Sequence, residues 1–392
     1  MDNKENKTLN VPTLRFKEFK SPWIRSSIEQ ISKVYDGTHQ TPNYKKNGVK
    51  FVSVENINDL YSSKKFISVN DYERNFKVKP TINNIFITRI GDIGTPSLIS
   101  ENEPLAYYVS LALLKINKIN PSFLYHYIQT QYFQKELWKR TLHVAFPKKI
   151  NKNEIGECKV FYPNSIDEQA KIAIFLGCLE KRIVVQNKII EYYESLIKGI
   201  SNHLLCKIED CPTIKLSDIL IEYNDKARQN NEYPILSSTM NGIFVQSEYF
   251  NKQAASEETV GYKKVPYGYC TYRSMSDTGE FRFNIQKIVE IGIVSPAYPV
   301  FTSVEYDMRF IAFYLNNSAR LRKQILEIKE GGTRFALPFS KLRSLTIPKI
   351  TRLQQTKIVD IYCLFSRKKE LEQRFLLKLK EQKDYLLSKM FI

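Results

Sequence analysis

The chain of 392 residues contains the same succession of segments twice. Each copy ends in a long helix-forming segment, and aligning Gln169 in the first with Gln355 in the second gives an offset of 186. The match continues upstream in one order: a strand-like run, a proline turn, an aromatic helix and a β-rich run that ends in arginine. The paired segments are residues 160–163 with 345–348, 145–147 with 336–338, 123–127 with 310–314, and 85–89 with 269–273. Internal similarity of this kind predicts one structural unit that is built twice.

The two long segments carry apolar stripes with helical spacing. Ten positions from Ile172 to Leu204 follow alternating steps of four and three, and nine of them are apolar or aromatic. This heptad spacing is typical of a helix that packs against another helix. The second stripe is less regular, because Lys369, Glu372 and Lys383 interrupt it. We expect the two helices to form an antiparallel pair; the alternative is two separate helices, each packed on its own domain.

These patterns predict an α+β fold with a pseudo-twofold internal repeat. Two similar mixed α/β domains would be joined by two long antiparallel helices that resemble a coiled coil, and the chain length suits two or three domains. The expected segments are a first domain over residues 1–165, a central helix over 166–208, a second domain over 209–350 and a C-terminal helix over 351–392.

The chain is strongly basic, with 59 Lys and Arg against 41 Asp and Glu and a formal net charge of +18 spread along its length. Such a surface predicts an anionic partner, either nucleic acid or an acidic membrane. The narrow apolar seam of the long helices favours a partner helix over a membrane surface. The absence of an apolar signal segment at the N-terminus, and of any stretch of about 18 apolar residues, predicts a cytoplasmic protein. We expect its six cysteines to be reduced, since none forms a C-x-x-C pair.

Motifs that bind cofactors or metals are missing from the sequence. No two of the fourteen glycines are separated by a single residue, no glycine precedes lysine, and the four histidines do not form H-E-x-x-H. These absences argue against a dinucleotide or S-adenosylmethionine loop, a Walker A loop and a zinc protease site. The run Asn120-Pro121-Ser122-Phe123 resembles the adenine-extrusion loop of methyltransferases. It lacks the second proline of that loop, and Asn-Pro-Ser is a good start for the aromatic helix.

A repeated but diverged domain on a basic chain suits a reader of a split site on duplex DNA. Phosphates supply affinity and base edges supply specificity, so one scaffold can carry different contacts in each copy. Identical domains would require a palindrome. Unlike domains predict an asymmetric target in two parts.

The two-copy layout resembles the specificity subunit of Type I restriction-modification systems over nearly the whole chain. The supporting motifs are residues 11–16 before Trp23, residues 37–42 followed by 49–57, the helix start Glu168-Gln169, and residues 388–391. The resemblance implies that two target recognition domains each read one half of a bipartite site in double-stranded DNA. It also implies that the helices set the spacing and dock two methyltransferase subunits. S-adenosylmethionine, ATP and Mg would be bound by those and by the motor-nuclease subunits, and this chain would have no cofactor and no catalysis of its own.

Twelve residues are candidate DNA contacts. The polar, basic stretch after the first strand run can enter a groove, and the two arginines at matching repeat positions suit contact with guanine. The remaining candidates flank the repeated proline turn and suit phosphate contacts. The candidates are Thr38, His39, Thr41, Tyr44, Lys45, Lys46, Arg89, Lys148, Lys149, Arg273, Thr333 and Arg334.

Each candidate has a simpler explanation. The stretch around His39 can be an ordinary solvated loop, and Arg89 and Arg273 can each form a structural ion pair. The aromatic residues Tyr125, Tyr127, Tyr132 and Phe133 recur at helical spacing and are expected in the core, not in base stacking.

Two other functions remain open from the sequence. The chain can be an autonomous nucleic-acid-modifying enzyme with an unfamiliar site, which would be active without partner subunits. It can also be a coiled-coil interaction protein, or a basic protein on an acidic membrane.

Overall fold

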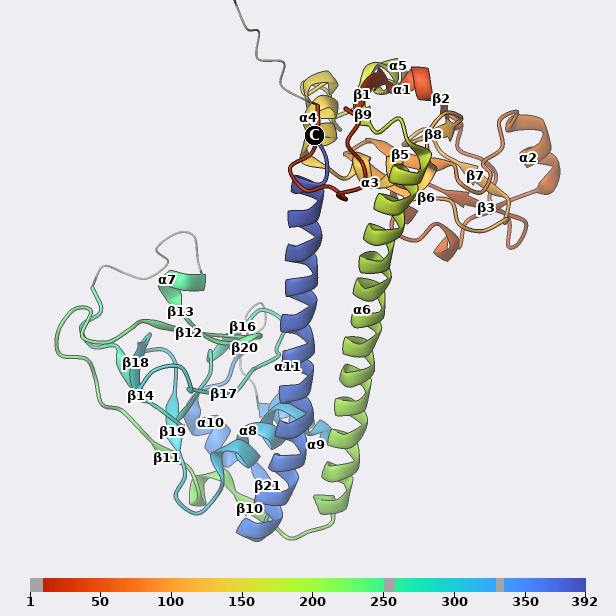
Figure 1. Cartoon of the computed structure of the whole chain (residues 1–392). Coiled ribbons are helices and arrows are strands. Elements are labelled where there is room, and N and C mark those ends of the chain that lie inside the picture. Colours follow the sequence, from red (N-terminus) through yellow and green to blue (C-terminus); the bar gives the residue numbers. More distant parts are fainter. Residues whose placement is uncertain (1–9, 250–257, 329–334) are drawn as a thin grey trace, which may run out of the picture. The chain divides into compact units, whose positions relative to one another are not determined.

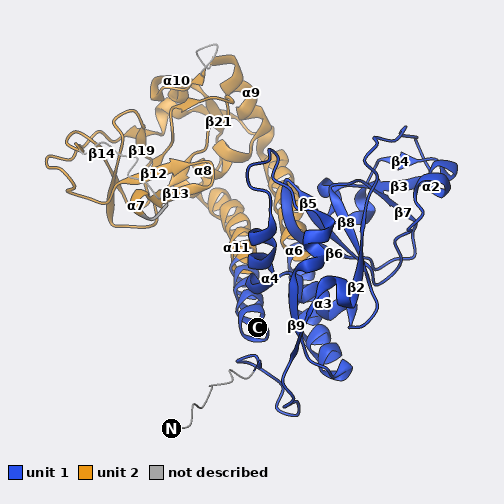
Figure 2. Cartoon of the chain, turned by 90° about the horizontal axis from the view of Figure 1, so that it is seen from above, with its two compact units in different colours: residues 1–187, 374–392 blue, residues 188–373 orange. Residues whose placement is uncertain are grey.

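The computed structural model describes residues 10–249, 258–328 and 335–392, and it divides the chain into two compact units (Figure 2). Unit 1 consists of residues 1–187 and 374–392, and unit 2 consists of residues 188–373. The helices α6 (Ile166–Glu209) and α11 (Arg352–Lys389) contribute residues to both units. The finer division into two recognition domains and two spacer helices stays a prediction.

The remaining elements follow one another along the chain as labelled in Figure 1. Those of unit 1 are β1 (Ile24–Ser27), α1 (Ile28–Ile31), β2 (Ser32–Asp36), β3 (Val49–Val52), η1 (Val54–Asn56), η2 (Leu60–Ser62), β4 (Phe66–Ile67), α2 (Val69–Asn75), β5 (Ile85–Ile90), β6 (Asp92–Leu98), β7 (Leu105–Tyr107), β8 (Leu111–Ile116), α3 (Pro121–Ile128), α4 (Gln131–Arg140), α5 (Lys152–Glu157) and β9 (Lys159–Tyr162). Those of unit 2 are β10 (Thr213–Lys215), η3 (Leu216–Asp218), β11 (Ile221–Glu222), β12 (Leu236–Thr239), β13 (Gly242–Val245), α7 (Gln246–Tyr249), β14 (Lys263–Pro266), β15 (Cys270–Thr271), β16 (Met275–Ser276), β17 (Asn284–Ile285), β18 (Ile291–Val294), β19 (Val300–Thr302), α8 (Met308–Asn317), α9 (Ala319–Ile328), β20 (Phe335–Ala336), α10 (Phe339–Ser344) and β21 (Thr346–Pro348).

The centre of unit 1 is a four-stranded antiparallel sheet in the order β2-β8-β5-β6. Its two central strands are apolar at almost every position because both faces of the sheet are covered. Ile85 and Ile87 belong to the core that contains α3 and α4, whereas Phe86 between them belongs to the core under the small sheet β4-β3-β7. Alternate side chains of one strand therefore hold two layers together.

Unit 2 repeats this arrangement with fewer regular residues. Its main sheet has the order β11-β19-β15-β17, which matches the order in unit 1 strand for strand. Phe301 of β19 packs in the core with α8 and α9, and the neighbouring Val300 faces a second small core. The strand pairs β1-β9 and β10-β21 are likewise equivalent and antiparallel. The structure thus confirms the expected mixed α/β fold and its internal repeat.

The two long helices are antiparallel partners inside each unit. In unit 1, Lys383 of α11 binds Glu180 of α6 at 2.6 Å, and the earlier residue Phe375 packs on the later residue Arg182. In unit 2, Lys369 lies 3.6 Å from Glu194. Two of the residues that interrupt the second stripe, Lys369 and Lys383, are therefore used in ion pairs between the helices. These contacts contradict the alternative of two helices packed only on their own domains. None of the described helices combines the length and apolar character that a membrane span needs.

A buried glutamine attaches each long helix to its own domain. The Gln169 amide accepts a hydrogen bond from the backbone N–H of Asn120 at 2.7 Å and donates one to the Pro163 carbonyl at 2.8 Å. Gln355 does the same in unit 2, accepting from the N–H of Asp307 at 2.8 Å and donating to the Ile350 carbonyl at 3.1 Å. Each glutamine therefore joins the first turn of a long helix to the cap of an aromatic helix and to the turn after a strand.

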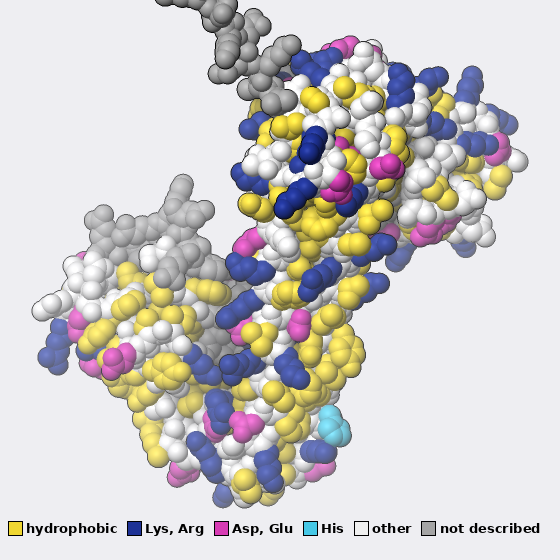
Figure 3. All heavy atoms as spheres, in the orientation of Figure 1, with side chains coloured by type: hydrophobic (Ala, Val, Ile, Leu, Met, Phe, Trp, Pro, Cys, Tyr) yellow, Lys and Arg dark blue, Asp and Glu magenta, His cyan; other side chains and the backbone are white. Residues whose placement is uncertain are grey.

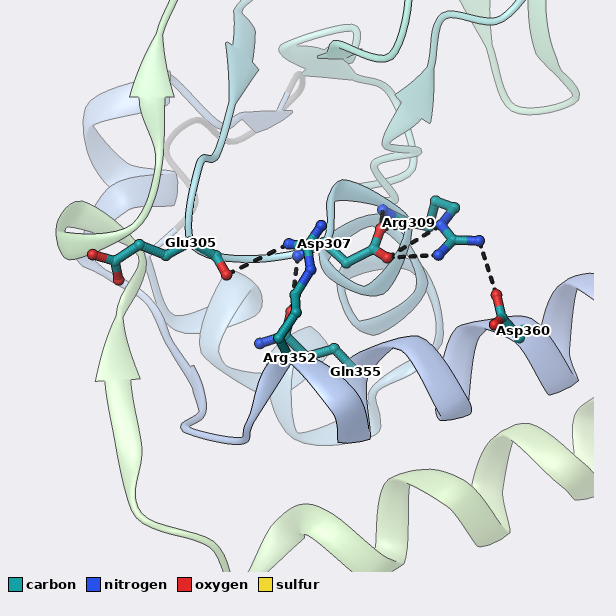
Figure 4. A network of polar contacts seen from close by, with 6 residues as sticks. All are labelled: Glu305, Asp307, Arg309, Arg352, Gln355 and Asp360. Atoms are coloured by element: carbon teal, nitrogen blue, oxygen red, sulfur yellow. Dashed lines mark hydrogen bonds and ion pairs between the residues drawn. The ribbon is translucent and has the colours of Figure 1, made fainter.

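An ion-pair network reinforces this junction in unit 2 (Figure 4). Arg309 on α8 binds Asp307 at 2.7 Å and Asp360 on α11 at 2.9 Å. Burial acts to raise the pKa of Asp307, but the hydrogen bonds from Arg309 outweigh it and lower that pKa below its ordinary value. In unit 1 the corresponding support is different, since Glu168 accepts two hydrogen bonds from Arg15 at 2.7 and 2.8 Å.

Replacing Gln169 with leucine tests the junction. Gln169→Leu keeps the volume of the side chain but leaves a buried N–H and a buried carbonyl without a partner. We expect the free energy of unfolding, measured by urea denaturation, to fall by about 2–3 kcal/mol. The matched control is Gln131→Leu on the exposed face of α4, where the change should stay within about 0.5 kcal/mol. Equal losses in the two variants would show that the glutamine is not a structural clamp.

Candidate nucleic-acid interface

The first candidate segment is the loop between β2 and β3. It begins at Gly37, where an added Cβ would lie 2.5 Å from the backbone of Tyr108, so only glycine permits this close approach. Thr38 is then fixed by backbone hydrogen bonds, donating to Tyr107 at 3.0 Å and accepting from Val109 at 2.9 Å. The loop therefore leaves the sheet from a rigid point.

Beyond this point the side chains turn to solvent. His39, Thr41, Lys45 and Lys46 are exposed, and Tyr44 is 45% exposed while its ring packs edge-on against a buried phenylalanine. Thr38 is half-buried and lines a hollow of about 160 Å³ together with Thr41. The backbone of Lys45 pairs with β4, which fixes the end of the loop. The loop therefore presents hydroxyl, imidazole and ammonium groups from a supported backbone, an arrangement suited to groove contacts.

Arg89 and Arg273 have different surroundings, although Arg89 lies near the end of β5 and Arg273 shortly follows the equivalent strand β15. Arg89 is only 6% exposed, forms an ion pair with Asp36 and donates a hydrogen bond to the Ile150 carbonyl at 3.0 Å. This is the structural ion pair that the sequence left open, so its side chain does not face a ligand in this conformation. Arg273 is exposed and lines a hollow of about 440 Å³ in unit 2.

Most of the residues that line the hollow beside Arg273 are polar, and Met240, Met275, Phe281 and Tyr298 complete its lining. It contains hydroxyl and amide side chains, two arginines and two acidic residues that come from the β12-β13 hairpin and the segment after β15. These are Ser237, Ser238, Thr239, Asn241, Arg273, Ser276, Asp277, Thr278, Glu280 and Arg282. Such a mixture of donors and acceptors can read the edges of bases.

The third segment, which contains Lys148 and Lys149, lies beside the end of β5. The N–H of Gly91 bonds to the Lys148 carbonyl at 2.9 Å, and Lys149 forms bridges with both Ile90 and Leu142. Both lysine side chains are exposed, and neither makes an ion pair within the described residues. Their counterparts Thr333 and Arg334 lie outside the described residues.

Arg89 joins two of these segments that are distant in sequence. Its guanidinium pairs with Asp36, directly before the loop that contains Thr38, and bonds to Ile150, directly after Lys149. Arg89 therefore connects the start of the loop to the segment that contains Lys148 and Lys149. Sequence reasoning missed Lys152, which also approaches Asp36 at 4.0 Å. It also missed the exposed apolar residues in the segment between Leu142 and Lys149.

Two cysteines and one histidine are buried and held neutral by their surroundings. Burial raises the pKa of the Cys158 thiol to about 12, and it raises the pKa of Cys270 above the usual range. Burial also lowers the pKa of His126 to about 4, although the neighbouring Glu180 acts in the opposite direction. Among the described residues, no group of three His, Cys, Asp or Glu side chains is arranged to hold a metal.

The segment that resembles an adenine-extrusion loop is a helix start, as predicted. Asn120 caps α3 by accepting a hydrogen bond from the N–H of Phe123 at 3.0 Å, and Pro121 occupies the first turn. Tyr127 and Phe133 are buried in the core and Tyr125 is half-buried, as expected for core aromatics. Tyr132 is the exception, with 44% of its surface exposed.

Comparisons with solved structures show a shared fold. The Type-I restriction-modification system S subunit from M. genitalium matches with a TM-score of 0.64 and 15% identity, covering 97% of this chain and 99% of that chain. A chain from a structure on complex assembly and conformational transition of the type I R-M system matches with a TM-score of 0.55 and 12% identity, covering 95% and 99%. No family model matches the chain, and no curated protein matches it by sequence. The fold expected from the resemblance is confirmed at nearly full length.

Replacing the two equivalent arginines should change the stability of the fold by different amounts, because only Arg89 is buried. Arg89→Met leaves the Ile150 carbonyl without its partner and Asp36 with only Lys152 at 4.0 Å, so we expect the free energy of unfolding to fall by about 2–3 kcal/mol. Arg273→Met changes an exposed side chain and should alter that free energy by less than about 0.5 kcal/mol. Urea denaturation of both variants checks this difference. A stable Arg89 variant would mean that the ion pair is dispensable.

Proposed function

We propose that this chain is the sequence-specific DNA-binding specificity subunit of a Type I restriction-modification complex. The observation that carries the proposal is one domain architecture present twice, with the same strand order and the same glutamine junction to a long helix. The shared fold with an S subunit over nearly the whole chain supports it. A formal charge of +18 supplies the long-range attraction to DNA.

Each unit would read one half of an asymmetric bipartite site in double-stranded DNA. Unit 1 would use the loop from Thr38 to Lys46 and the segment with Lys148 and Lys149. Unit 2 would use Arg273 and its polar hollow, together with Thr333 and Arg334. The two surfaces are built on equivalent strands but carry different groups, which supports different half-sites. The long helices would set the number of unread bases between them.

The long helices also carry exposed apolar residues at repeated positions outside the seam. This repeated apolar surface suits docking of two methyltransferase subunits. Val185 on α6 and Leu371 on α11 occupy equivalent positions under the offset of 186, and each is 55% exposed. Phe175 and Ile361 form a second equivalent pair, 43% and 42% exposed. Hydrophobic side chains along the helices are visible on the surface in Figure 3. Two matching apolar surfaces on one chain fit two copies of one partner.

The chemistry would belong to partners. Methyltransferase subunits would bind S-adenosylmethionine and modify adenine, and motor-nuclease subunits would use ATP and Mg. This chain would be a cytoplasmic recognition subunit in host defence, with no catalytic residue. The neutral, buried state of Cys158 and His126 agrees with that division of labour.

Mapping methylated adenines in cells tests the proposal. Cells that express the chain with its methyltransferase should show one asymmetric bipartite motif, which should disappear when the chain is deleted. Replacing residues 209–350 with the equivalent domain of another specificity subunit should change one half of the motif only. The chain purified alone should methylate nothing. Modification of DNA by the isolated chain would instead identify an autonomous enzyme, and changes in both half-sites would contradict separate reading.

Charged substitutions in the repeated apolar surface test docking of the methyltransferase. We expect Val185→Asp or Leu371→Asp to remove one methyltransferase subunit from the complex and the double variant to remove both, because burying an unpaired carboxylate is costly. Native mass spectrometry reports the stoichiometry directly. Val184→Asp is the matched control, since Val184 is 54% exposed but its counterpart on α11 is already Glu370. Full complexes from the double variant would locate the docking surface elsewhere.

A further inference from the structure

The segment between α4 and α5 ends in an apolar tip that the core does not use. Phe146 is 104% exposed and Val144 is 99% exposed, the largest exposures among the hydrophobic side chains of the described residues. Full burial of such side chains is worth about 1.5–3 kcal/mol each. Their exposure therefore favours an external partner that covers them.

The base of this tip is rigid. The N–H of Leu142 donates to the Lys149 carbonyl at 2.8 Å, which closes the segment as a short hairpin. Ile150, fully buried, anchors its second arm through a hydrogen bond from its N–H to the Arg89 carbonyl at 3.0 Å. Thr141 anchors the first arm by donating from its hydroxyl to the Leu137 carbonyl at 2.8 Å. A partner can therefore be engaged without the cost of ordering the hairpin base.

The surroundings of the tip are basic, which selects the kind of partner. Lys148 lies 5.0 Å from the centre of the Trp138 ring, and His143 packs on the same ring at 4.0 Å. Lys148 and Lys149 are exposed beside the tip and are free of ion pairs in the described part of the chain. A polyanion with apolar interior faces satisfies both features, because phosphates pair with lysine and base faces stack on aromatic rings.

We propose that Phe146, with Val144 beside it, inserts as a wedge at a base step of the DNA bound by unit 1, while Lys148 and Lys149 hold the flanking phosphates. This inference rests on the proposed function and deepens it. An apolar wedge partly unstacks the step that it enters and bends the duplex. The wedge therefore favours base steps that unstack easily, such as pyrimidine–purine steps. This preference adds to the sequence recognition that the polar groups provide.

The experiment uses the complex of the full chain with its methyltransferase and a duplex that carries the mapped methylation site. 2-Aminopurine is placed in turn at each position in and beside the half-site read by unit 1. With the wild-type complex, fluorescence should rise at one step, and Phe146→Ser should abolish that rise and weaken binding about tenfold. Phe146→Leu should keep most of both effects. The control Val304→Ala changes an equally isolated valine, 79% exposed in unit 2, and should have no effect.

Salt dependence separates the wedge from the lysines. Phe146→Ser should leave the slope of log affinity against log salt unchanged, whereas changing Lys148 and Lys149 to glutamine should reduce its magnitude by about 2. No local fluorescence change with intact site-specific binding would overturn the wedge but not the proposed function. Two other outcomes would also overturn the wedge. Loss of methyltransferase from the Phe146→Ser complex would assign the tip to a protein partner. Loss of binding to phosphatidylserine vesicles, with DNA binding unchanged, would assign the tip to a membrane. No binding to the mapped site by wild-type protein would reject the proposed function itself.

Discussion

The buried amide of Gln169, and its equivalent Gln355, is the interaction on which the rest of the structure depends. Each is 1% exposed, and each satisfies one N–H from the cap of an aromatic helix and one carbonyl from the turn before its long helix. A buried backbone group without a partner costs more than most single contacts supply. A side chain that both donates and accepts is needed to satisfy these two groups, so each glutamine helps to fix the direction in which its long helix leaves the domain.

The fixed junction allows the surfaces of the two copies to diverge. Strand β5, which contains Arg89, and strand β15, which precedes Arg273, occupy the same place in their sheets. In unit 1 the arginine is turned inward to Asp36 and supports two basic segments. In unit 2 it is exposed beside a polar hollow. The same position thus supports a surface in one copy and forms part of it in the other, as unlike half-sites would require.

The buried titratable groups of the described residues include two thiols and one imidazole. The buried thiols of Cys158 and Cys270 stay protonated, and buried His126 stays neutral near pH 7. Charged groups are instead gathered in loops and along the long helices, where Lys383 and Lys369 join the helix pair. Exposed apolar residues occur at equivalent places on both helices.

The sequence by itself determined the repeat, the two long helices and the mixed α/β fold, because these depend on periodicity and on matches at a constant offset. It predicted their antiparallel pairing, but only the contacts between α6 and α11 excluded separate helices. It also identified Asn120 as a helix cap, since capping is a local property. The role of Arg89 was decided only by the tertiary structure: its partners Asp36 and Ile150 are far away in sequence, and no local pattern distinguishes it from Arg273. The exposure of Phe146 was decided in the same way. An apolar residue in a proline turn is buried or exposed according to what packs over it, and only the folded chain shows that nothing in its described part does.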